Sequence, residues 1–141
     1  MRTVAIINQK GGCGKTTTAI NLSACLAQLK KKVLLADMDP QAHATLGLGF
    51  TPGAYPKSMY DLLAGNDEDH ASVGDVILEI SPCLHLIPSD VMLCAAEPAL
   101  MQRDYREYCL SDVFAGISEV YDFIIIDCPP NIGMLTFNAL F

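Results

Sequence analysis

Four apolar runs along the chain show little alternation between hydrophobic and polar residues. Runs of this kind are typical of strands that a parallel sheet buries on both faces. They predict strands at residues 3–8, 33–37, 84–88 and 121–127. Because a helical pattern separates the first two, strand, helix and strand form a βαβ unit. The pattern therefore predicts an α/β fold with a doubly wound, mostly parallel sheet flanked by helices.

The helical pattern between the first two strands runs from about Lys15 to Lys31. Its predicted buried stripe recurs at helical spacing and comprises Ala19, Leu22, Leu26 and Leu29. Three lysines, residues 30–32, stand at the C-terminal end, where the helix dipole favours cations. We expect these lysines to form a solvated helix end rather than a nucleic-acid patch.

The rest of the chain alternates turn-rich segments with shorter helical patterns. Ser58 is placed as the N-cap of a short helix that ends at Ala64. Residues 73–80 favour neither helix nor strand. The remaining segments are a Gly/Pro-rich connection at 40–57 with one helical turn near 42–48, a surface loop at 66–70, and helices at 91–101, 105–120 and 133–141.

The composition is that of a globular chain with a core of its own. Of its 141 residues, 51% are hydrophobic and 18% are charged, and the formal net charge is −7. That charge argues against nonspecific binding of nucleic acid through the field of the whole chain, and it leaves a local basic patch open.

The six cysteines form no C-x-x-C pair and lack the usual spacing of metal ligands. Several lie in apolar runs, as reduced core cysteines do. The N-terminus does not have the pattern of a signal peptide, and the charge-free stretch 40–56 is too rich in Gly and Pro to span a membrane. These features predict a cytoplasmic protein.

Residues 9–18, QKGGCGKTTT, form a glycine-rich turn between the first strand and the first helix. The phosphate-loop pattern G-x-x-x-x-G-K-[ST] has glycine where this chain has Gln9, and Lys10 follows. In such a turn, backbone N–H groups and the positive end of the helix bind anions together. The glycines that let the backbone curve closely around phosphate oxygens are Gly11, Gly12 and Gly14.

Three side chains of this turn have the chemistry that a nucleoside triphosphate requires. Lys15 supplies a positive charge to the β- and γ-phosphates, and Thr16 offers a hydroxyl ligand to Mg²⁺. Thr17 is placed to bond a phosphate oxygen from the first helical turn. Residues 3–31 supply strand, glycine turn and helix in order, which favours a phosphate loop over a chance glycine turn.

Three aspartates follow buried strands. Asp127 ends the strand at 121–127, as the metal-organising carboxylate of nucleotide enzymes does, and would hold a Mg²⁺-bound water; capping a turn is the alternative. Asp37 and Asp39 close the second strand. Because parallel strands deliver their carboxyl ends to one crevice, we expect these aspartates to converge on the loop. An aspartate near the γ-phosphate could orient or deprotonate an attacking water.

Three stretches of the chain resemble the ParA/MinD ATPases. KGGCGKTT is similar to their deviant Walker A motif, K-G-G-x-G-K-[ST]-[ST]. DMDPQAHAT resembles the D-x-D-P-Q-x-N-x-T segment of ParA and Soj partition proteins, and its P-Q pair favours ParA over MinD. YDFIIIDCPPNIGMLTFNAL resembles the ParA Walker B strand with the loop and helix after it. The chain departs from the family's pattern at His43-Ala44, so the resemblance implies nothing about the loop contacts there. The role implied for Asp39 is not affected.

The resemblance implies an ATPase that uses ATP and Mg²⁺ and becomes a dimer when ATP binds. It implies that Lys10 reaches across a two-fold interface to the other subunit's ATP, where a side chain at Gly11 would clash. Asp39 is implied to position the hydrolytic water. The implied catalytic residues are Lys10, Lys15 and Asp39; the metal-site residues are Thr16, Asp37 and Asp127; the nucleotide-binding residues are Lys10, Gly11, Gly12, Cys13, Gly14, Lys15, Thr16 and Thr17.

The resemblance covers the N-terminal portion of the family's domain. We therefore expect residues 1–141 to be a single nucleotide-binding domain, truncated at its C-terminus. For the full-length protein, the resemblance implies an ATP-dependent homodimer, a ParB-like activator and nonspecific DNA, and hence association with the nucleoid. The implied process is chromosome or plasmid partition, or intracellular positioning.

Alternatives to this function stay open at this point. One is a same-fold iron–sulfur or metabolic ATPase, of the nitrogenase iron protein or cluster-carrier type, and another is an inactive fragment of the ParA domain. Cys13 is either a reactive thiol at a helix N-terminus or a small apolar replacement in the variable place of the loop.

Overall fold

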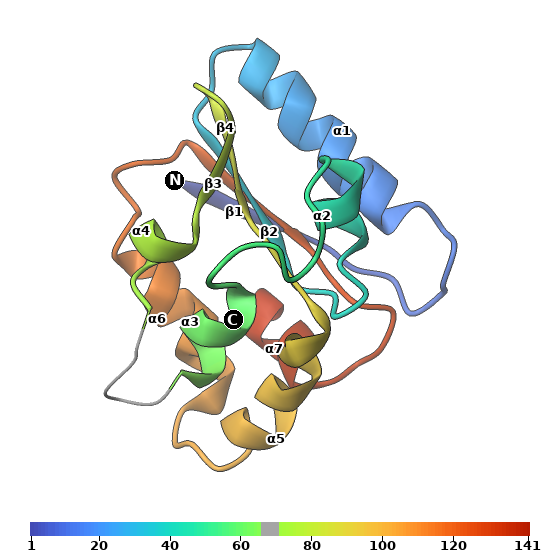
Figure 1. Ribbon diagram of the computed structural model, residues 1–141, viewed down its shortest axis with the longest axis vertical. Coiled ribbons are helices and arrows are strands. Elements are labelled where there is room, and N and C mark those ends of the chain that lie inside the picture. The colour runs from blue at the N-terminus through green and yellow to red at the C-terminus, as the bar shows by residue number, and fades with distance from the viewer. Residues whose placement is uncertain (66–70) are drawn as a thin grey trace.

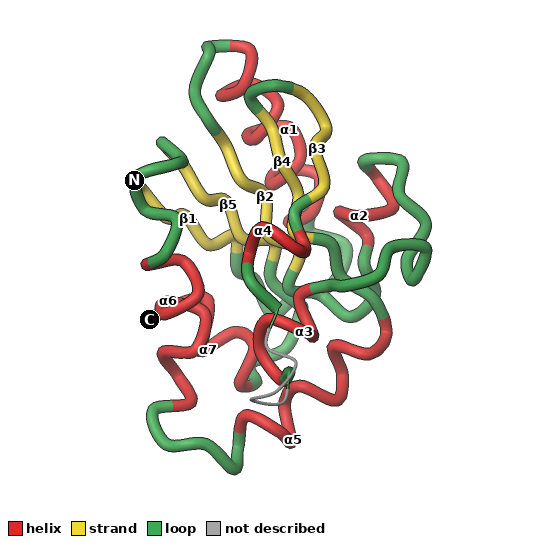
Figure 2. The backbone as a smooth tube through the Cα atoms, turned by 60° about the vertical axis from the view of Figure 1, so that its left-hand side comes forward, coloured by secondary structure: helices red, strands yellow, loops and turns green. Residues whose placement is uncertain are grey.

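The computed structural model describes residues 1–65 and 71–141, and its centre is a five-stranded sheet in the order β1-β5-β2-β4-β3. Figure 2 shows β1, β5 and β2 side by side. All neighbouring strands are parallel except β3 and β4. The predicted fold class is therefore confirmed. The strands are β1 (Arg2–Ile6), β2 (Val33–Asp37), β3 (Leu78–Ser81), β4 (Leu84–Ile87) and β5 (Phe123–Asp127).

Helices cover both faces of the sheet (Figure 1). On one face, Val33 and Leu35 pack with α1 (Lys15–Gln28) and α2 (His43–Gly47). On the other face, Leu34 and Ala36 pack with the remaining α-helices. This alternation follows from the pleat, which points successive side chains to opposite faces. The second layer contains α3 (Met59–Ala64), α4 (Val73–Val76), α5 (Ala96–Leu100), α6 (Cys109–Ala115) and α7 (Met134–Leu140).

The first strand departs from the prediction of burial on both faces. β1 lies at one edge of the sheet and pairs with β5. Residues 2–4 are exposed, and Ala5 and Ile6 are half-buried. In the described residues, β1 has a strand neighbour on one side only, so the predicted burial on both faces is not observed; an apolar run does not report the position of a strand within its sheet.

The ambiguous segment 73–80 contains a fifth strand that the sequence pattern did not predict. Its first part is the single turn of α4, and its second part leads into β3. β3 pairs antiparallel with β4, with an irregular register between Glu79 and Ser81. The change from helix to strand within a few residues explains why no single period fits this segment.

The first helix is shorter than predicted. It ends at Gln28, and Lys30 adopts a left-handed conformation with φ of 61°. Leu29, which was predicted in the buried stripe, is 71% exposed. Ala19 is fully buried, and Leu22 and Leu26 pack against the core as predicted. The lysines at 30–32 are exposed, as expected for a solvated helix end.

The short helix α3 begins at the predicted cap. The Ser58 hydroxyl accepts a hydrogen bond from the Tyr60 backbone N–H at 3.3 Å, and the Asp61 carboxylate accepts one from the Ser58 N–H at 2.7 Å. Ser58 and Asp61, the N-cap and N3 residues, form a capping box. The loop predicted at residues 66–70 lies outside the described residues.

The predicted helices at 91–101 and 105–120 are each broken into shorter pieces. Val91–Ala95 is a 3₁₀ turn that runs into α5, and Arg106–Tyr108 is another 3₁₀ turn that precedes α6. Tyr105, with a left-handed φ of 54°, is the N-cap of the second turn, so the helical segment begins at Arg106. α6 ends before Gly116.

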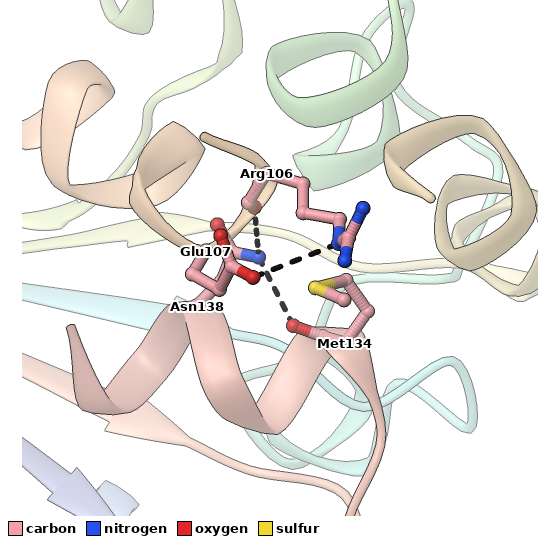
Figure 3. A network of polar contacts seen from close by, with 4 residues as sticks. All are labelled: Arg106, Glu107, Met134 and Asn138. Carbon is pink, nitrogen blue, oxygen red and sulfur yellow. Dashed lines mark hydrogen bonds and ion pairs between the residues drawn. The ribbon is translucent and has the colours of Figure 1, made fainter. Parts of the chain in front are cut away.

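An asparagine joins the end of the chain to this broken region (Figure 3). The Asn138 amide on α7 donates to the Arg106 carbonyl at 2.8 Å and to the Met134 carbonyl at 3.0 Å. Its oxygen accepts from the Leu110 N–H at 3.0 Å. Arg106 and Glu107 form an ion pair at 3.6 Å beside it. None of the helices in the described residues is both long and apolar enough to cross a membrane.

Candidate functional site: a phosphate loop at the carboxyl edge of the sheet

The glycine-rich turn leaves β1 at Ile6 and enters α1 at Lys15. Gly12 and Gly14 have positive φ values of 70° and 87°, a conformation that residues with a side chain rarely adopt. A Cβ built at Gly11, Gly12 or Gly14 would meet no described atom within 4 Å. Side chains at these positions would therefore project into open space, and the glycines at 12 and 14 are explained by their backbone conformation.

The loop passes directly into the N-terminus of α1. Gly14 is the N-cap residue, and its carbonyl accepts the first helical hydrogen bond from the Thr18 N–H at 2.8 Å. The N–H groups of the first turn, which have no partner within a helix, point toward the loop. The Lys15 ammonium lies 3.5 Å from the Lys10 carbonyl and folds back over the turn. This end of the helix thus combines a lysine charge with the positive end of the helix dipole.

The three predicted aspartates lie at the carboxyl ends of neighbouring strands. Asp127 on β5 is in register with Ile6 of β1 on one side and with Asp37 of β2 on the other. The Met38 N–H donates to the Asp127 carbonyl at 2.9 Å, which fastens the segment after β2 to the end of β5. The parallel pairing therefore brings Asp37, Asp39 and Asp127 to the edge where the loop begins.

Asp127 has the environment of a cation ligand. Its side chain is fully buried, and among the described residues neither carboxylate oxygen has a hydrogen-bond partner. Burial raises the pKa of Asp127, and so does the nearby Asp39, while Thr16, Lys15 and His43 act to lower it. A buried carboxylate without partners fits Mg²⁺, which proteins hold through one or two carboxylates together with nucleotide phosphates and waters. Thr16 and Asp127 would hold the ion here.

Asp37 is turned away from this role by its hydrogen bonds. One oxygen accepts from the Asp39 N–H at 3.1 Å, and the other accepts from the Thr45 N–H and hydroxyl at 2.8 and 2.7 Å. Burial raises the pKa of Asp37 to about 7, while the bonds from Thr45 and Asp39 act to lower it. This geometry favours an anchoring role for Asp37 over the predicted role as a metal ligand.

Asp39 lies where the segment after β2 meets the loop. It is 8% exposed, and one carboxylate oxygen accepts from the Gln41 N–H at 2.9 Å. Its carbonyl accepts from the Ala42 N–H at 2.8 Å, which closes a tight turn. The aspartate is thus held by its own turn while its side chain contributes to the wall of a cavity.

The loop and the Asp39 turn enclose a cavity of about 520 Å³. A second cavity of about 550 Å³ lies between α3, α4 and α6, so size alone does not identify the site. The first is distinguished by its glycine cradle, its lysine and its aspartate. Its lining residues are Gly11, Gly12, Cys13, Gly14, Lys15, Thr16, Thr17, Asp39, Gln41, His43 and Pro130.

Some residues of the site were not singled out from the sequence. Gln41, His43 and Pro130 line the cavity, and the Thr45 hydroxyl donates a hydrogen bond to the Asp37 carboxylate. Thr45 could have been predicted, because it matches the final threonine of the D-x-D-P-Q-x-N-x-T pattern. Lys10 is exposed, and the described lining of the cavity begins after it, at Gly11.

The cysteines have the environments of unmodified thiols. All six are free, and Cys128, which follows Asp127, is buried. Burial raises the pKa of Cys128 to about 12, so it stays protonated and is a poor metal ligand. In the described part of the chain, no three His, Cys, Asp or Glu side chains gather closely enough to hold a metal ion by themselves.

Comparison with known proteins places this geometry in a family. The profile of a family described as "AAA domain" matches residues 1–141. The chain belongs to this family. The AAA domain of this chain is 46% identical over 138 residues to the sporulation initiation inhibitor protein Soj of Bacillus subtilis (strain 168), covering 97% of this chain and 53% of Soj. The predicted resemblance to ParA and Soj proteins is confirmed.

Two further relatives extend the comparison. The AAA domain is 43% identical over 141 residues to the chromosome-partitioning ATPase Soj of Treponema pallidum (strain Nichols), covering 99% of this chain and 53% of that protein. A crystal structure of cobyrinic acid a,c-diamide synthase from Mycobacterium smegmatis, with bound ATP analogue and magnesium, matches with a TM-score of 0.93 and 37% identity. That match covers 99% of this chain and 56% of the synthase.

The chain thus spans about half the length of the curated relatives it matches. The ligands of the synthase structure are the same two, an adenine nucleotide and magnesium, that the sequence predicts for this chain.

Proposed function

We propose that this chain is the nucleotide-binding portion of a ParA-like ATPase that binds and hydrolyses Mg-ATP. The observation that carries the proposal is that Lys15 and Asp39 line one cavity, while Asp127 is buried at the same edge of the sheet and its carboxylate has no hydrogen-bond partner among the described residues. Phosphoryl transfer to water needs little more than positioning and charge stabilisation, which such a constellation supplies.

Each group has a separate part in this proposal. The loop N–H groups and Lys15 bind the phosphates, and Thr16 with Asp127 holds Mg²⁺, which neutralises charge on the β- and γ-phosphates when bound. Asp39, which lines the same cavity, orients or deprotonates the attacking water. Asp37 keeps the Asp39 turn in place through its bonds to Asp39 and Thr45.

The dimer switch is a further part of the proposal. Lys10 is exposed beside the loop and is free to reach the ATP of a second subunit. In the full-length protein the ATP-bound homodimer would act in chromosome or plasmid partition, or in intracellular positioning. A ParB-like activator and nonspecific DNA are the proposed partners, and the nucleoid the proposed location. The match to Soj proteins at 43–46% identity supports the proposed role in partition or positioning.

The test separates binding from turnover. Lys15→Ala should abolish Mg-ATP binding, whereas Asp39→Ala should retain binding and lose hydrolysis, each measured by calorimetry and phosphate release. Thr18→Ala, on the same helix but outside the described lining, is the control. Normal ATP affinity in Lys15→Ala would refute the loop assignment, and wild-type turnover in Asp39→Ala would refute its role with water.

A metabolic ATPase of the same fold is the second candidate, because the solved synthase is 37% identical over nearly the whole chain. The two functions differ in what stimulates turnover. DNA and a ParB-like protein should accelerate ATP hydrolysis by a partition ATPase and leave a metabolic enzyme unchanged. Measurements of iron content and visible absorbance test the iron–sulfur alternative, which the high pKa of the Cys128 thiol disfavours.

A further inference from the structure

His43 lines the same cavity as the glycine loop. It is exposed, and it lines the cavity together with Asp39 and Gln41. It is also the first residue of α2, which lies beside α1 in Figure 1. The imidazole therefore borders the same space as the phosphate-binding groups of the loop.

The position of His43 is fixed by the residues around it. Ala42, just before it, is buried and has a left-handed φ of 53°, which sets the direction of the chain into α2. Thr45, two residues later, donates a hydrogen bond to Asp37 and accepts one from the Ser89 N–H at 3.0 Å. With Ala44 and Thr45 fully buried, the backbone has little freedom to turn His43 out of the wall.

His43 lies close to the proposed magnesium ligand. Lys15 and His43 both act to lower the pKa of Asp127, so the imidazole lies within electrostatic range of the proposed magnesium ligand. Asp39, four residues earlier on the same wall, is the residue proposed to hold the attacking water. A bound nucleotide would therefore present its terminal phosphate, rather than its base, to this wall.

We propose that His43 is a specificity-determining residue whose imidazole N–H donates a hydrogen bond to the terminal phosphate of the bound triphosphate. The inference rests on the proposed function, because it requires ATP in the loop. It adds a contact that distinguishes ATP from ADP, since ADP has no phosphate at that place. Hydrogen bonds to charged groups are stronger than neutral ones, which makes the contact large enough to measure.

The test compares two nucleotides in one variant. Mg-AMPPNP and Mg-ADP are titrated into wild type and His43→Ala, at protein concentrations at which sedimentation shows monomer. We expect His43→Ala to bind AMPPNP about ten-fold more weakly and ADP within about two-fold of wild type. His43→Asn, which keeps an N–H donor of similar reach, should recover part of the AMPPNP affinity. Leu46→Ala, an exposed position on α2 away from the described lining, should change neither.

The outcomes separate this inference from the function beneath it. Wild-type protein that binds neither nucleotide would overturn the proposed function. Wild-type protein that binds both, with an unchanged ratio of the two affinities in His43→Ala, would overturn the role of His43 alone. An equal loss of affinity for both nucleotides would also overturn the role of His43, because a general disturbance of the cavity does not discriminate between them.

Discussion

The carboxylate of Asp37 accepts two hydrogen bonds from Thr45, one from the backbone N–H at 2.8 Å and one from the hydroxyl at 2.7 Å. Both residues are fully buried. The pair joins the end of β2 to α2, and the cavity residues 39–43 lie on the connection between them. The position of the cavity residues Asp39, Gln41 and His43 therefore depends on this contact.

Removing the Thr45 hydroxyl should destabilise the protein. Thr45→Val keeps the shape of the side chain but leaves the buried Ser89 N–H without its acceptor and removes one bond from Asp37. We expect a loss of about 2–4 kcal/mol in the free energy of unfolding, measured by urea denaturation. Thr45→Ser, which keeps the hydroxyl, should lose about 1 kcal/mol. Equal stability of the Val and Ser variants would show that the hydroxyl does not anchor α2.

The same pair predicts how stability depends on pH. Because burial raises the pKa of Asp37 to about 7, the folded state holds a proton that the unfolded state releases near pH 4. The stability of the nucleotide-free protein should therefore fall as pH rises from about 4 to about 7 and level off above that.

Urea denaturation in EDTA at pH 5 and pH 8 checks this dependence. Asp37→Asn removes the titrating group, so the variant should lose less stability between the two pH values than wild type does. An identical loss in both proteins would mean that Asp37 does not hold the proton. Asp127, whose pKa is also raised, accounts for a residual slope of the same sign.

The loop and the strand ends were predictable because their determinants are local. A phosphate loop requires a strand, glycines and a helix in immediate succession, and residues 3–31 contain all of them in order. Once the strands are parallel, the convergence of Asp37, Asp39 and Asp127 follows from topology. The sequence therefore predicted the place of the site and its proposed phosphate-binding side.

The opposite wall was not predictable in the same way. Whether Asp37 faces a metal or a protein group depends on where α2 packs, and the partner that decides it, Thr45, is eight residues away. His43 lines the cavity directly after Ala42, whose left-handed conformation no hydrophobic period records. The edge position of β1 likewise depends on strand order rather than on its apolar composition.

Cys13 should be protected from alkylation by nucleotide. It is exposed and lines the cavity, so a bound phosphate chain would cover its thiol. We expect Mg-ATP to slow the reaction of Cys13 with a maleimide several-fold, followed by mass spectrometry of each cysteine. Cys25, exposed on α1 and outside the described lining, is an internal control whose rate should not change. Equal rates at Cys13 with and without ATP would place it outside the nucleotide site.

Lys10→Ala should separate dimerisation from nucleotide binding. Lys10 is exposed and its backbone N–H is fixed by the Asn8 side chain at 2.9 Å, so the loop should keep its shape without the ammonium. Since Lys15 serves the nucleotide of its own loop, the variant should still bind Mg-AMPPNP but remain a monomer, as measured by light scattering. Lys30→Ala, an exposed lysine after the far end of α1, should dimerise like wild type. An undiminished AMPPNP-dependent dimer of Lys10→Ala would contradict the role across the interface, because the charge proposed to reach the second nucleotide would then be dispensable.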